Sequence, residues 1–224
     1  MKRRQKKRIN LKKILLFFML LIIIYLIVVL FLNVKTKNII ILNNEYYTDE
    51  KIIETAGIEN YPKFILLNKK SIKDKLKKLD LIEDVKISKK WGFILKIDVK
   101  EKKVLYYVRS KEEYMTSDKN TYKLDNLLGY PTLINYVPED IEKSFVRELS
   151  KIDTNIIKMI SEIEYSKTDF DDKRFLLYMN DGKEVYITVS RVNLLNKYIE
   201  IIQKLGKKDG ILYLDSGNYF EIKK

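Results

Sequence analysis

The sequence contains no histidine and no cysteine among its 224 residues. Without them the chain has no imidazole general base, no Ser-His-Asp or Cys-His nucleophile pair, and no thiolate or imidazole ligand for zinc. Disulfide bonds are excluded as well, so any folded domain must be held together by its hydrophobic core. The chain is long enough for one or two domains that bury most of their apolar surface.

Glycine is scarce too, and none of the seven glycines forms a Gly-x-Gly or Walker pattern, which argues against a phosphate-binding loop. No serine is followed three positions later by lysine, so the Ser-x-x-Lys signature of penicillin-binding enzymes is missing. The densest carboxylate cluster is Asp169, Asp171 and Asp172. Aspartate commonly stabilises turns between apolar segments, so we interpret this cluster as a solvated turn. The EF-hand pattern is also missing, and the sequence predicts no cofactor, no metal site and no enzymatic activity.

One long apolar run, residues 14–32, stands out from the rest of the sequence and contains no charge. As a helix rising about 1.5 Å per residue it would be roughly 28 Å long, which matches a hydrocarbon core of about 30 Å. Ile14 and Leu32 therefore bound a predicted transmembrane anchor. A cleaved signal peptide is the alternative, but the run exceeds the usual apolar region of about 7–15 residues and no small-x-small cleavage site follows it.

The charge distribution predicts the orientation of this span. Eight cations precede it and two follow closely, so residues 1–13 are expected to form a cytoplasmic basic tail and residues 38–224 to lie outside the cytoplasm. The remainder of the chain carries 34 Lys and Arg against 31 Asp and Glu, so the net charge of +13 is mainly a topology signal. A nucleic-acid partner is therefore not expected. The lysines of residues 69–78 are interpreted as a solvated helix face.

The first extracytoplasmic segment has a compact pattern of strands and helices. Residues 39–42 read as a strand, and Thr48 is predicted to cap a helix that ends at Gly57. A second helix is predicted over residues 68–79 from apolar positions at helical spacing. Two alternating segments then predict a β-hairpin with one buried face, residues 85–88 and 93–99.

This βααββ order behind one membrane span resembles the polypeptide-transport-associated (POTRA) domain of the FtsQ/DivIB family of bacterial division proteins. Residues 41–52 are similar to the family's first strand, turn and capped helix. Residues 82–91 and 95–102 are similar to its hairpin and closing acidic-basic stretch, although Gly92 stands where the family usually has proline. The resemblance implies a POTRA domain over residues 38–108.

The resemblance continues through residues 109–224, which are expected to form the family's second, β-rich domain. Residues 114–124 read as a hairpin in which Asn120 takes the place of the family's turn glycine, and Asp181-Gly182 centres another. Residues 138–152 are predicted to form a helix. Residues 194–206 are similar to the helix that precedes the family's last strands, and residues 210–222 are similar to its terminal strand pair. The fold class is thus α+β, with an N-terminal transmembrane helix, a POTRA domain and a mostly antiparallel β domain with flanking helices.

The resemblance implies a non-enzymatic membrane scaffold of the division septum. Its implied partners are the small coiled-coil proteins FtsB (or DivIC) and FtsL and, through them, the septal peptidoglycan synthase. The expected mode of binding is β-augmentation, in which an unpaired strand edge accepts another chain. The residues predicted to contribute lie in the last two strands: Ile211, Leu212, Tyr213, Leu214, Asp215, Tyr219, Phe220 and Ile222.

Strand alternation places Ile211, Tyr213 and Asp215 on one face and Leu212 and Leu214 on the other, without deciding which face is outward. Core packing is therefore an equal alternative for each of these residues. Two other functional hypotheses stay open. One is another POTRA-type membrane assembly factor, although no second βααββ pattern follows residue 108, and the other is a membrane-anchored hydrolase that uses the clustered aspartates.

Overall fold

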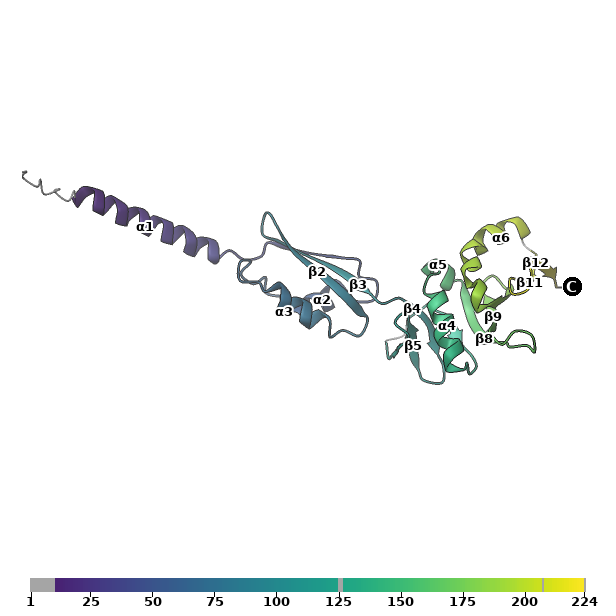
Figure 1. Ribbon diagram of the computed structural model, residues 1–224. Coiled ribbons are helices and arrows are strands. Elements are labelled where there is room, and N and C mark those ends of the chain that lie inside the picture. The colour runs from purple at the N-terminus through teal and green to yellow at the C-terminus, as the bar shows by residue number, and fades with distance from the viewer. Residues whose placement is uncertain (1–10, 125–126, 207, 224) are drawn as a thin grey trace, which may run out of the picture. The chain divides into compact units, whose positions relative to one another are not determined.

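The computed structural model describes residues 11–124, 127–206 and 208–223, which form two compact units divided between Glu101 and Lys102 (Figure 1). The first unit begins with α1 (Leu11–Leu32), which includes the predicted anchor from Ile14 to Leu32. Within the described residues it is the one helix long and apolar enough to cross a membrane, and its large apolar side chains are almost all exposed. The predicted basic tail lies outside the described residues except for its last three.

A small sheet covered by two helices follows α1. Its strand order is β1-β3-β2, with β1 parallel and β2 antiparallel to β3. The elements occur in the predicted βααββ order: β1 (Asn38–Leu42), α2 (Asp49–Ala56), α3 (Lys69–Leu76), β2 (Ile82–Lys90) and β3 (Ile94–Glu101). Apolar side chains of both helices pack on one face of the sheet and form the core of this unit.

Local sequence sets the ends of these helices. The Thr48 hydroxyl accepts a hydrogen bond from the Lys51 backbone N–H at the start of α2, and Gly57 ends this helix in the left-handed conformation that glycine adopts without strain. Asn68 caps α3 by accepting hydrogen bonds from two backbone N–H groups of its first turn. Thr48 and Gly57 bound α2 as the sequence predicted, whereas α3 ends at Leu76 rather than at residue 79.

The boundary between the two domains lies earlier than expected. The range 38–108 includes β4 (Val104–Val108), but this strand pairs with β5 (Glu113–Thr116) and β7 (Thr132–Leu133) in the second sheet. Because the strands that pair with β4 belong to the second domain, that domain begins at Lys102 instead of residue 109.

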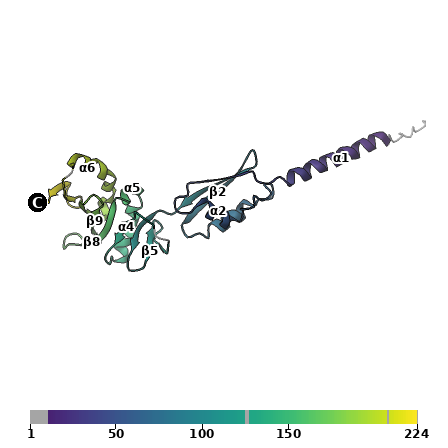
Figure 2. The same ribbon diagram turned by 180° about the vertical axis from the view of Figure 1, so that it is seen from behind.

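The second unit is built on a nine-stranded sheet in the order β12-β11-β10-β9-β8-β7-β4-β5-β6. Strands β5, β8 and β9 of this sheet are labelled in the reverse view of Figure 2. Five neighbouring pairs are antiparallel and three are parallel, so the predicted mostly antiparallel sheet is confirmed. The remaining elements are β6 (Thr121–Tyr122), α4 (Glu139–Leu149), α5 (Thr154–Ile157), β8 (Ile160–Tyr165), β9 (Arg174–Met179), β10 (Glu184–Thr188), the 3-10 helix η1 (Val189–Lys197), α6 (Tyr198–Leu205), β11 (Gly210–Tyr213) and β12 (Tyr219–Ile222).

The core of this unit lies between one face of the sheet and the helices. Phe145 of α4 stacks on Phe175 of β9 with ring centroids 3.9 Å apart. Tyr198, at the start of α6, is fully buried and donates its hydroxyl hydrogen to the Asp181 carboxylate. Burial and this hydrogen bond raise the pKa of Tyr198, which keeps the hydroxyl a neutral donor. Asp181 and Gly182 form the predicted turn between β9 and β10, with Gly182 at a φ of 84°.

Two local predictions are wrong. In the turn between β5 and β6 the left-handed residue is Lys119, with a φ of 68°, and Asn120 follows it, donating its backbone N–H to the Asp118 carboxylate. The helix predicted over residues 194–206 is divided into η1 and α6. The buried residues leading into α6 recur at every third position, the spacing of a 3-10 helix: Val189, Val192, Leu195 and Tyr198.

Candidate partner-binding site

The residues predicted to bind a partner lie on the last two strands of the second sheet. β11 is paired on both sides, with β10 in parallel and with β12 in antiparallel orientation. β12 is the end strand, and no other strand of the described structure lies along its outer side. The edge predicted at residues 211–215 is therefore occupied, and β12 is the edge that a partner could extend.

The outward backbone groups of β12 follow from its pairing. Residues of an antiparallel ladder alternate between hydrogen-bonded and non-bonded pairs. The Lys223 N–H donates to the Asp209 carbonyl at 3.1 Å, which in the observed register makes residues 219 and 221 the bonded partners of β11. Phe220 and Ile222 then direct their backbone N–H and C=O groups away from β11, where an added strand would bind them.

Burial shows which face of β11 points inward. Leu212 and Leu214 are 3% and 2% exposed and belong to the core. Phe220, which pairs with Leu212, packs against the same core. The prediction that these three side chains contact a partner is corrected, because the domain's own side chains enclose the face on which they lie.

The opposite face carries a ladder of three tyrosines, Tyr186 on β10, Tyr213 on β11 and Tyr219 on β12. The ring centroids of Tyr186 and Tyr213 are 5.3 Å apart, those of Tyr213 and Tyr219 are 4.5 Å apart, and both pairs are stacked. The guanidinium of Arg174 on β9 lies 3.6 Å from the centre of the Tyr186 ring. Such contacts stabilise neighbouring strands through their side chains as well as their backbones. We call Tyr186, Tyr213 and Tyr219 the tyrosine ladder.

An ion pair connects the end of β11 to β9. Arg174 Nε donates to Asp215 Oδ2 at 2.7 Å, and the two side chains are 15% and 8% exposed. Burial opposes ionisation of Asp215, but hydrogen bonds from Arg174 and from the Ser216 N–H outweigh it and lower the pKa of Asp215. Arg191 donates to the Asp215 carbonyl and to the Asn218 side chain. Asp215, predicted to bind a partner, instead positions the turn that leads into β12.

Four of the predicted residues remain accessible: Ile211, Tyr213, Tyr219 and Ile222. Tyr219 and Ile222 are 52% and 53% exposed. The Tyr213 hydroxyl donates to Glu221 at 3.0 Å, and burial together with this hydrogen bond raises the pKa of Tyr213 to about 12. The candidate site therefore consists of the outer edge of β12 and the exposed end of the tyrosine ladder.

Sequence reasoning missed Tyr186 and Arg174 as parts of this surface. The alternation of Tyr186 between the buried residues Val185 and Ile187 does indicate an outward side chain. Nothing in the sequence, however, shows that β10 lies beside β11.

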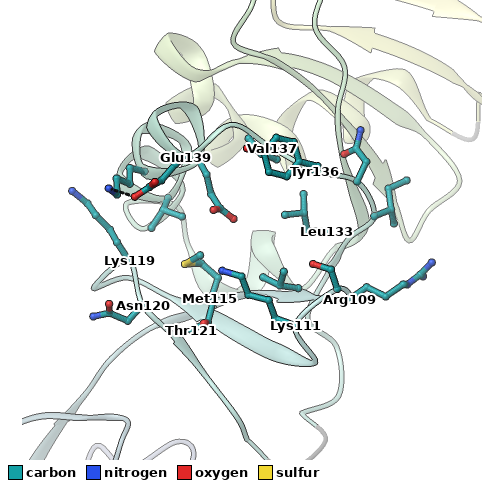
Figure 3. Close-up of a pocket in the computed structure, with 17 residues that line it drawn as sticks. Arg109, Lys111, Met115, Lys119, Asn120, Thr121, Leu133, Tyr136, Val137 and Glu139 are labelled. Atoms are coloured by element: carbon teal, nitrogen blue, oxygen red, sulfur yellow. Dashed lines mark hydrogen bonds and ion pairs between the residues drawn. The ribbon is translucent and has the colours of Figure 1, made fainter.

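A surface groove of about 720 Å³ lies between the β4–β5 hairpin, β7 and α4 (Figure 3). Its floor is apolar, with Met115 and Leu133 buried, and basic side chains of four residues stand around it: Arg109, Lys111, Lys119 and Lys143. Glu139 forms an ion pair with Lys143, and Glu142 accepts a hydrogen bond from the Tyr106 hydroxyl. No predicted site residue lies in this groove.

The three aspartates considered as catalytic groups lie on the loop between β8 and β9. The Asp171 carboxylate accepts a hydrogen bond from the Lys173 N–H, and the Thr168 hydroxyl accepts one from the Asp171 N–H. Asp169 and Asp172 are exposed. These local hydrogen bonds show the aspartate-stabilised turn that the sequence predicted. In the described part of the chain, no three acidic side chains are grouped to hold a metal ion.

Comparison with known proteins finds a family model for the first domain and relatives that cover most of the chain. Residues 34–102 match the family model described as "POTRA domain, FtsQ-type". The chain is 28% identical over 194 residues to the cell division protein DivIB of Bacillus subtilis, covering 84% of this chain and 74% of that protein. It is 26% identical over 180 residues to DivIB of Brevibacillus brevis, covering 76% and 68%.

A solved structure, the major extracytoplasmic domain of DivIB from Geobacillus stearothermophilus in its trans isomer, aligns with 47% of this chain and 95% of its own at 23% identity and a TM-score of 0.38. The family model covers the βααββ unit, and the DivIB relatives extend over most of the chain. Residues 34–102 are therefore similar to an FtsQ-type POTRA domain, and the chain as a whole is similar to DivIB cell-division proteins over most of its length.

Proposed function

We propose that this cell-division protein is a non-enzymatic scaffold of the septum. α1 anchors it in the cytoplasmic membrane with the N-terminus inside, and β12 captures small coiled-coil partners of the FtsB/DivIC and FtsL type by β-augmentation. Through these partners the protein would connect to the septal peptidoglycan synthase. One observation carries the proposal: β12 is an end strand whose outward backbone groups, at residues 220 and 222, face no other strand of the described structure.

β12 has few of the features that protect an edge strand from pairing. Proteins blunt such edges with proline, with charged side chains or with very short strands. β12 contains four residues and no proline, and its one charged residue, Glu221, is held by the Tyr213 hydroxyl. The exposed ring of Tyr219 lies beside this edge and offers the kind of aromatic contact that often dominates interfaces.

Two of the other three sheet edges are less suitable. β6 has only two residues, and β2 carries exposed lysines at Lys86 and Lys90. β1 is the remaining edge. Lys37 donates its backbone N–H to the Phe93 carbonyl, so that Ile40, three positions on, directs its backbone groups away from β3. Ile40 therefore provides a matched comparison for Ile222.

Replacing Ile222 with proline should weaken partner capture at least about tenfold, because it removes an outward N–H that an added strand needs and crowds the position beside it. Ile222→Ala keeps the N–H and should cost much less. The measurement is a calorimetric titration of the full-length protein in nanodiscs. The titrant is the small coiled-coil division protein that cross-linking in dividing cells identifies as its partner. Equal binding of the proline and alanine variants would contradict β-augmentation at β12, and a loss confined to Ile40→Pro would assign the partner to β1.

Replacing Tyr219 with aspartate tests the face of the site rather than its edge. The side chain is half exposed, so the domain should stay folded, whereas a charge would disfavour an apolar contact at the end of the tyrosine ladder. We expect partner capture to fall by about tenfold or more, as for other interface aromatic residues. Tyr136→Asp is the control, since Tyr136 is 83% exposed at the groove beside α4. Unchanged capture by folded Tyr219→Asp protein would exclude the ladder from the interface.

A further inference from the structure

One end of the POTRA sheet is tied closely to the membrane span by the path of the chain. α1 ends at Leu32 and β1 begins at Asn38. The Lys37 N–H donates to the Phe93 carbonyl at 2.9 Å, next to the turn between β2 and β3. Five extended residues reach at most about 18 Å, so this turn stays near the membrane if α1 crosses it.

The loop between α2 and α3 lies at the same end. The Thr36 N–H donates to the Pro62 carbonyl at 3.0 Å, and the Phe64 N–H donates to the Val34 carbonyl at 2.9 Å. The rings of Phe64 and Phe93 pack edge to face with centroids 5.6 Å apart. Three segments thus form one surface, which we call the span-proximal surface: residues 34–37, 58–70 and 90–93.

Large apolar side chains project from this surface. Trp91 is 100% exposed, Leu66 is 65% exposed and Tyr61 is 44% exposed. Gly92 and Phe93 have φ values of 84° and 62°, which define the tight turn that follows Trp91. Tryptophan and tyrosine are enriched at the boundary between membrane and water, because the rings are apolar and carry one polar group. Trp91 therefore combines full exposure with a position close to the membrane span, where tryptophan is enriched.

The charge of the span-proximal surface is strongly positive. Its exposed cations are Lys35, Lys37, Lys63, Lys69, Lys70 and Lys90, and the one acidic residue in its three segments is Glu59. Lys89, immediately before the last segment, is committed to the domain, since it donates to the Ile65 carbonyl at 2.9 Å and lies over the Phe64 ring. At the opposite end of the sheet, Lys86 and Lys100 are balanced by three acidic residues, Asp84, Asp98 and Glu101. The excess of lysines over acidic residues is thus found at the end that chain connectivity holds near the membrane.

We propose that the span-proximal surface docks on the outer leaflet of the membrane that α1 crosses. Trp91 and Leu66 enter the headgroup region, and the surrounding lysines contact anionic phospholipid headgroups. Each lysine near an anionic surface strengthens such association about fivefold. Docking would hold the POTRA domain in one orientation on the membrane instead of leaving it free to tilt about the end of α1. The inference depends on α1 spanning the membrane and is independent of partner binding at β12.

The chain carries its own probe, because Trp91 is its single tryptophan. The full-length protein would be reconstituted in vesicles of phosphatidylcholine alone or with phosphatidylglycerol, with brominated acyl chains as depth-dependent quenchers. We expect the emission of Trp91 to shift to shorter wavelength and to be quenched by brominated lipid in anionic vesicles, with iodide quenching reduced at least twofold. The triple variant Lys63→Gln, Lys69→Gln, Lys90→Gln should abolish these changes.

A matched triple variant, Lys51→Gln, Lys78→Gln, Lys100→Gln, removes the same charge from the opposite end of the domain and should behave like the wild-type protein. Trp91 emission that is equally red and equally accessible to iodide in neutral and anionic vesicles would overturn the proposal. So would a lipid response that survives the first triple variant. A Trp91 response to a soluble anionic polymer in neutral vesicles, without a response to anionic lipid, would replace the lipid surface with a polyanionic partner.

Discussion

Replacement of Gly210 with alanine should detach β12 from the sheet while the rest of the domain stays folded. A Cβ atom at this position would lie 2.1 Å from the Glu221 carbonyl oxygen and 2.6 Å from the Phe220 ring. The first of these is a backbone atom of the paired strand, so the conflict cannot be relieved by turning a side chain. Overpacking of this kind costs about 1–3 kcal/mol. A four-residue end strand with few hydrogen bonds can move away at a comparable cost, whereas the core cannot.

Hydrogen exchange of the full-length protein is the measurement for Gly210→Ala. The backbone N–H groups of Tyr219, Glu221 and Lys223 should lose protection, while those of β9 and β10 keep theirs. Partner capture should fall together with this protection, because an added strand needs β12 in place. Gly217→Ala is the control, since its Cβ would approach only the Tyr219 side chain, at 3.0 Å. Retained protection and capture in Gly210→Ala would show that β12 accommodates the added Cβ without leaving the sheet.

Replacing Asp215 with asparagine should cause the largest loss of stability in the second domain. Arg174 would then be left mostly buried without a counter-charge, which typically costs about 3–5 kcal/mol. We expect the free energy of unfolding of this domain to fall by about 3 kcal/mol. Because the pKa of Asp215 is lowered in the folded state, its contribution is present above the ordinary aspartate pKa and is lost as the pH falls through the folded value. The difference between variant and wild type should therefore shrink in acid.

Unfolding of Asp215→Asn in urea is monitored through the hydrogen exchange of β9. Tryptophan fluorescence would not report on this domain, because the single tryptophan lies in the other one. Arg174→Leu combined with Asp215→Leu is the control: removing both charges should destabilise less than removing the carboxylate alone. A loss below about 0.5 kcal/mol for Asp215→Asn, the size of an ordinary surface substitution, would show that the pair is solvated and does not hold β11 to β9.

The sequence alone determined the features that depend on local or compositional rules. The absence of histidine and cysteine, the uninterrupted run of residues 14–32 and the caps at Thr48 and Gly57 each have a direct physical meaning that needs no tertiary contact. The same holds for the Asp181-Gly182 turn. The alternation along β11 correctly separated Tyr213 from Leu212 and Leu214, because successive strand residues always point to opposite faces.

Only the tertiary structure decided how those pieces are used. Period-two alternation defines two faces but not which is buried, and the core formed with α4 and α6 resolved that in favour of Leu212 and Leu214. Strand order is set by contacts between distant segments. The parallel pairing of β10 with β11 made β12 the edge, turned Asp215 into the partner of Arg174 and completed the tyrosine ladder with Tyr186. These contacts join residues about 25 to 40 positions apart, a separation over which local propensity carries no information.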